Sequence, residues 1–165
     1  RATGALTVTP APARSDDTIT TQEYFSYYKL DTTRAKGYTG KGVTIAMIDG
    51  PVDTSAPELA GANITVKTPC EYEAANSTRT HAILVSKNYG LAPDATLIAY
   101  SSPSVDDEAL GGCKKDNHDL SDTTFATIGM AMNDGAQIIS ISRSDPNHKQ
   151  TPLKWAMARA MAHGQ

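Results

Sequence analysis

Three apolar segments of this chain each end at polar residues whose side chains are able to do chemistry. Asp49 follows the first segment, Ser101 and Ser102 follow the second, and Ser142 to Ser144 follow the third. The segments are short and rich in β-branched residues, which predicts strands buried on both faces of a mainly parallel sheet. Such sheets hold ligands at the carboxyl ends of their strands. We therefore expect the functional site at these residues.

Asp49 has two interpretations. A carboxylate at the end of a buried strand is costly without a partner. It could orient and stabilise a catalytic imidazolium, as the aspartate of a serine protease triad does. It could instead cap the turn that Gly50 and Pro51 form behind it.

The elements that position these residues alternate between strands and helices. The pattern predicts strands at 43–48, 63–67, 95–100 and 137–142, and helices at 24–30, 82–87, 120–134 and 151–163. Phe125, Ile128 and Met132 share one face of the third helix. Leu153, Met157 and Met161 share one face of the last helix. This order predicts a three-layer α/β fold with a mainly parallel sheet.

Composition excludes several classes of partner. The formal net charge is -3 and the pI is about 5.7, so no basic surface for nucleic acid is expected. No run of 18 apolar residues predicts a membrane span. Residues 1–20 are rich in Ala, Thr, Pro and Ser, and we interpret them as an extended arm or the remnant of a pro-region. The first residue is Arg1 rather than Met, which suggests excision from a longer precursor.

The two cysteines lie in polar stretches. Cys70 and Cys113 are interpreted as a disulfide of a secreted or extracellular protein. Two unrelated thiols are the alternative. A zinc site of Cys113 and His118 is disfavoured, because the chain has no CxxC pair.

Four segments resemble, in order, the catalytic domain of subtilisin-like serine proteases (peptidase family S8). The first is the Gly-rich turn and strand that end in Ile48-Asp49, and the second is Val52-Asp53 with Pro57-Glu58-Leu59. The third and fourth are Gly-Leu-Ala-Pro-Asp-Ala at 90–95 and Gly-Ala-Gln-Ile-Ile-Ser-Ile-Ser at 135–142. Residues 21–165 resemble the amino-terminal part of that domain, so the fold would be incomplete in this chain.

The resemblance implies an endopeptidase with an Asp-His-Ser triad, in which Asp49 orients the base. The family's Gly-Thr-Ser block and its oxyanion donor fall beyond the equivalent of residue 165. The chain alone is therefore expected to be inactive. Its expected partners are a peptide or protein substrate and a second chain or fragment that carries the serine.

The catalytic histidine has two alignments, because the family's His-Gly-Thr-x-x-Ala pattern is not intact here. In the alignment that we prefer, His81 is the base and the stretch behind it is shortened. In the other, Thr80-His81 matches the later Thr-His of His-Gly-Thr-His, and Thr78 stands where the base should be. An ordinary surface histidine is the third interpretation of His81.

Further residues acquire roles from the resemblance. Ser142, Arg143 and Ser144 match the strand that pairs with the substrate backbone, and Arg143 would favour an acidic or polar substrate side chain. Arg143 is otherwise an ordinary solvent-facing residue. Glu58 matches a ligand of structural calcium, an ion that needs six or more oxygens, and no cofactor is required.

Two other functions compete with the peptidase. A pseudoprotease or binding module would keep the fold without the chemistry, which the altered histidine pattern favours. A nucleotide-binding protein would need its glycines after the first strand, whereas here they precede it.

Overall fold

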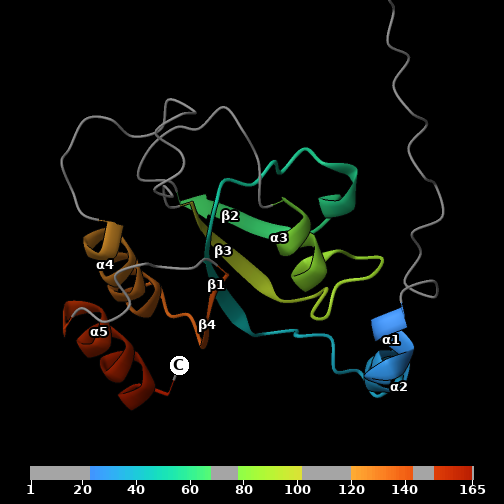
Figure 1. Cartoon of the computed structure of the whole chain (residues 1–165). Helices are drawn as coiled ribbons and strands as arrows, with labels where there is room; N and C mark the ends of the chain where they lie inside the picture. Colours follow the sequence, from blue (N-terminus) through green and yellow to red (C-terminus); the bar gives the residue numbers. More distant parts are fainter. Residues whose placement is uncertain (1–22, 68–77, 102–119, 143–150, 165) are drawn as a thin grey trace, which may run out of the picture.

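The computed structural model describes residues 23–67, 78–101, 120–142 and 151–164 (Figure 1). Its four strands form one parallel sheet in the order β2-β3-β1-β4. The strands are β1 (Thr44–Asp49), β2 (Asn63–Lys67), β3 (Thr96–Ser101) and β4 (Ile138–Ile141). The helices are α1 (Glu23–Tyr27), α2 (Leu30–Ala35), α3 (Thr78–Val85), α4 (Leu120–Asn133) and α5 (Thr151–Ala162), with a short 3-10 turn η2 (Pro57–Leu59).

The sheet is the middle of three layers, as the sequence predicted. Figure 1 shows α4 and α5 on one side of the sheet and α3 on the other. Side chains alternate along β1, so that Ala46 and Ile48 join the core beneath α4 and α5. Ile45 and Met47 point the other way and join the core that includes Ala82 and Val85 of α3. Since β1 has a helical layer on both faces, it is the central strand of the core.

The turn into β1 is fastened to the segment before β3. Gly40 has a φ of 78°, in the left-handed region, and a Cβ there would lie 2.7 Å from the Cβ of Ala92. Only glycine fits both constraints. The N–H of Asp94 donates to the carbonyl of Thr39 at 2.9 Å. Two of the segments that resembled the protease family therefore contact each other directly.

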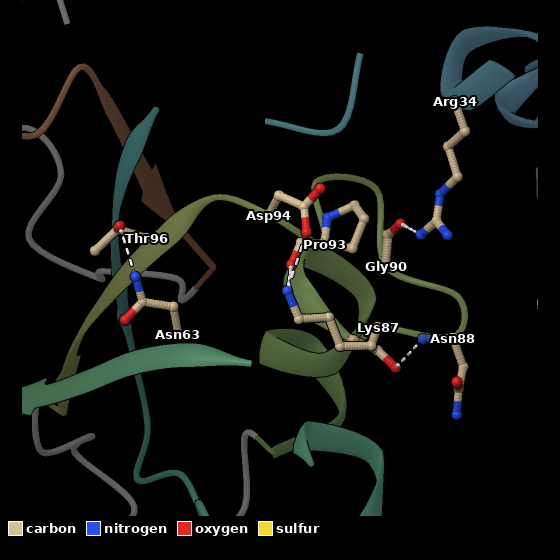
Figure 2. A network of polar contacts seen from close by, with 9 residues as sticks. Arg34, Asn63, Lys87, Asn88, Gly90, Pro93, Asp94 and Thr96 are labelled. Atoms are coloured by element: carbon tan, nitrogen blue, oxygen red, sulfur yellow. Dashed lines mark hydrogen bonds and ion pairs between the residues drawn. The ribbon is translucent and has the colours of Figure 1, made fainter. Parts of the chain in front are cut away.

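Lys87 also contacts this segment. Its Nζ donates to the carbonyl of Pro93 at 2.6 Å and lies 3.1 Å from Oδ1 of Asp94 (Figure 2). These contacts fix the path by which the chain enters β3.

The amino-terminal helix differs from the prediction. One helix was expected at 24–30, but Lys29 takes a left-handed conformation with φ 54° and separates α1 from α2. Phe25 is buried, whereas Tyr27 is 80% exposed, so the aromatic segment does not lie on the core as a whole. Arg34 of α2 donates to the carbonyl of Gly90, which ties this pair of helices to the loop after α3 (Figure 2).

The prediction that 137–142 forms a strand buried on both faces was wrong. β4 is an edge strand of the described sheet, and Ile138 is 49% exposed. A run of apolar residues indicates a strand but does not tell a central strand from an edge strand.

The large apolar residues that share one face of α5 are not all buried. Leu153 is buried, but Met161 is 73% exposed, and Ala160 takes the inner position instead. The small alanine side chains allow α5 to approach the core closely, which a pattern based on large apolar residues does not detect. By contrast, Phe125 and Met132 of α4 pack against the core around Ile128, as predicted.

A polar network links β2 and β3 to the residue that follows α4. The hydroxyl of buried Tyr100 donates to Oδ2 of Asp134, and the same oxygen accepts from Lys67 Nζ at 2.6 Å. The hydrogen bonds from Lys67 and Tyr100 hold the pKa of the Asp134 carboxyl below its usual value. Burial raises the pKa of the Tyr100 hydroxyl, and the bond to Asp134 adds to this effect.

The lowered pKa of Asp134 makes stability depend on pH. The contribution is complete above the pKa of an unfolded aspartate, about 4, and is lost as the pH falls through the lower folded-state value. We therefore expect the urea midpoint of the chain to fall below about pH 4. Asp134→Asn should weaken that dependence, whereas Asp31→Asn on the exposed surface of α2 should preserve it. An unchanged profile in Asp134→Asn would show that the network does not stabilise the fold.

Candidate functional site

Three polar residues form a row at the carboxyl edge of the sheet. Ser101 of β3 is the register partner of Asp49 in β1. On the other side of β1, Ile48 pairs with Ile141, and the N–H of Ser142 donates to the carbonyl of Ile48 at 3.1 Å. The structure therefore brings together the three strand ends at which the sequence placed the site.

Asp49 occupies the centre of this row. Asp49 is 8% exposed, and its Oδ1 accepts a hydrogen bond from the N–H of Gly50 at 2.8 Å. Alternation along β1 gives Asp49 the same direction as Ile45 and Met47, toward the side that α3 covers. A carboxylate in this position is largely shielded from water, so its interactions are stronger than at a surface.

Ser101 is more deeply buried than Asp49. It is 1% exposed, and its Oγ makes no hydrogen bond within the described part of the chain. It faces the same side as Leu97, four positions earlier in β3, and thus the same side as Asp49.

His81 lies in α3, on the side of the sheet that Asp49 faces, and is completely enclosed. It is the fourth residue of α3 and is 0% exposed. The residues that follow it in the helix, Ala82 and Val85, join the core that includes Met47. The interpretation of His81 as an ordinary surface histidine was therefore wrong.

Thr78 is the first residue of α3. Its Oγ1 accepts a hydrogen bond from the N–H of Asp53 at 3.0 Å, so it faces the segment that follows β1. The helix was expected at 82–87 and begins four residues earlier. The contact with Asp53 was not predicted from the sequence, although threonine is a common residue at helix starts and gave a usable signal.

Several predicted site residues lie outside the described part of the chain. They are Arg143 and Ser144, the cysteines Cys70 and Cys113, and His118. Ser142 is described and exposed. The role of 142–144 in substrate binding and the disulfide both stay predictions.

The calcium site also stays a prediction. Glu58 is exposed in η2, and within the described ranges no group of three or more His, Cys, Asp or Glu residues could hold a metal ion. No helix in the part of the chain that is described is long and apolar enough to cross a membrane.

Comparisons by sequence found no match, either among protein-family models or among curated proteins. Solved structures do match. The prenylagaramide maturation protease PagA gives a TM-score of 0.59 at 20% identity, over 81% of this chain and 47% of that one. The PatG macrocyclase domain gives 0.59 at 15% identity, over 82% and 57%. MycP1 from Mycobacterium smegmatis gives 0.61 at 23% identity, over 93% and 44%.

The likeness to these structures concerns the fold alone, because the identities are low. The chain spans about half the length of the solved structures that it matches. One of these proteins, the PatG macrocyclase, has also been solved in complex with a peptide. The chain therefore has the α/β fold of subtilisin-like proteases, with Asp49, Ser101 and Ser142 at the carboxyl edge of its sheet.

Proposed function

We propose that the chain is the amino-terminal half of a subtilisin-like domain that binds peptides but lacks a catalytic base. The enclosure of His81 supports this proposal most strongly. Thr78, not His81, stands at the start of α3, which is where the second alignment places the family's base. In this assignment His81 is a structural residue of the core.

A general base must come within hydrogen-bond reach of the proton that it removes. An imidazole with no exposed surface cannot meet a serine or a substrate. The missing half of the domain would not change this, because additional protein covers surface and does not uncover it. The hydroxyl of Thr78 is far too weak a base to take the place of an imidazole.

Peptide binding would use the edge of the sheet. β4 has one neighbour, β1, in the described sheet, so its other edge offers backbone groups to an extended chain. Residues 142–144 would continue this edge and pair with a peptide backbone by strand addition, with Arg143 near an acidic or polar side chain. The peptide complex of the PatG macrocyclase supports peptides as the class of ligand.

An active endopeptidase is the second candidate, favoured by one observation. Asp49 and His81 lie on the same side of the sheet. In this mechanism, His81 takes the proton of a serine outside this chain as the serine attacks the peptide carbonyl, and then protonates the leaving amine. Asp49 stabilises the imidazolium. The mechanism requires α3 to move, so that His81 becomes accessible.

Both candidates fit an exported protein. We propose a secreted or extracellular location with a Cys70–Cys113 disulfide, on the composition of the chain alone. A structural calcium at Glu58 belongs to the same set of proposals.

An assay of peptide hydrolysis distinguishes the two proposed functions. The 165-residue chain and the product of its whole coding sequence are each incubated with a fluorophosphonate probe and a mixed peptide library, with active subtilisin as the positive control. We expect no hydrolysis by either protein, and the same background from Asp49→Asn. Hydrolysis by the longer product that His81→Gln abolishes would contradict the proposal and establish the peptidase.

The structural role of His81 predicts a loss of stability when it is removed. His81→Ala leaves a cavity in the core and should lower the free energy of unfolding by about 2–4 kcal/mol. His163→Ala, at an exposed position behind α5, is the matched control and should have no effect. Equal stabilities of the two variants in urea unfolding would argue against a core position for His81.

A further inference from the structure

Asp49 and Ser101 are buried neighbours, and each has a side-chain oxygen without a hydrogen bond to the described part of the chain. Oδ1 of Asp49 accepts from Gly50, and no described residue donates to its Oδ2. The Oγ of Ser101 makes no hydrogen bond within the described ranges. Buried polar groups are nearly always paired, and each one left unpaired costs stability.

The register of the sheet places the two side chains within reach of each other. Asp49 and Ser101 are partners on adjacent parallel strands, whose backbones lie about 4.8 Å apart. Both side chains face the α3 side of the sheet. The serine hydroxyl can change between staggered rotamers, and one of these directs it along the sheet toward β1.

We infer that Ser101 is a positioning residue for Asp49, whose hydroxyl donates to Oδ2 of the carboxylate and fixes its orientation at the end of β1. With the N–H of Gly50 on Oδ1, both carboxylate oxygens then have a donor. A hydroxyl is suited to this role because it supplies a proton without adding a second charge to the buried site.

Other described neighbours are less suited to the role. Ser140 faces the same side as Ser101, but its register partner in β1 is Met47, which lies two positions before Asp49. Ser142 lies beside Asp49 but is exposed, so water competes for its hydroxyl. Ser101 is the neighbour from which water is excluded.

The inference does not depend on which proposed function is correct, because its test involves no catalysis. Three variants of the chain are compared: Ser101→Ala, Ser101→Thr, and Ser140→Ala as the matched control on the other neighbour of β1. The readouts are the side-chain carboxyl carbon resonance of Asp49 and the urea midpoint. We expect Ser101→Ala to shift the resonance and lower the midpoint, Ser101→Thr to restore both, and Ser140→Ala to leave the resonance in place.

A double-mutant cycle then separates a specific pair from loss of packing. In the Asp49→Ala background, Ser101→Ala should lose most of its effect on the midpoint. An equal effect in both backgrounds, with the Asp49 resonance unmoved by Ser101→Ala, would overturn the inference.

A measurement on the unaltered chain covers the case in which the variants do not fold. The Ser101 hydroxyl proton should exchange slowly with water and show a nuclear Overhauser contact to the β-protons of Asp49. Exchange as fast as that of an exposed serine hydroxyl would refute the assignment.

Discussion

The position of β1 between two neighbouring strands and two helical layers determines most of this structure. Its even-numbered residues, Ala46 and Ile48, are buried beneath α4 and α5, and its odd-numbered residues Ile45 and Met47 are buried on the α3 side. A shift of one residue in its register would exchange the two sets and turn Asp49 to the other face. The same packing that fixes the core therefore fixes the direction of the carboxylate.

The sequence predicted those features that depend on local pattern. The strand ending at Asp49 and the helix around Ile128 follow from apolar runs and from a 3.6-residue period, and both are present. Features set by distant contacts were not predictable in this way. The exposure of Ile138 follows from the edge position of β4 in the described sheet, and the inward face of α5 depends on Ala160.

In the candidate site, too, the sequence predicted what depends on local pattern and not what depends on distant contacts. The sequence identified Asp49, Ser101 and Ser142 because strand ends can be located from the ends of apolar runs, and the sheet brings these three together. It could not decide between the two alignments of the histidine. The burial of His81 is set by the residues that pack around the folded helix, whereas the position of Thr78 at the helix start had only its residue type as a signal.

In the proposed function, His81 belongs to the core and not to a reactive site. Diethyl pyrocarbonate modifies accessible imidazoles, and peptide mapping reports the extent at each histidine. In the folded chain we predict that His163, which is exposed, is modified rapidly while His81 stays unmodified until the chain unfolds in urea. Modification of His81 at the rate of His163 under native conditions would show that its imidazole is accessible and would favour a role as catalytic base.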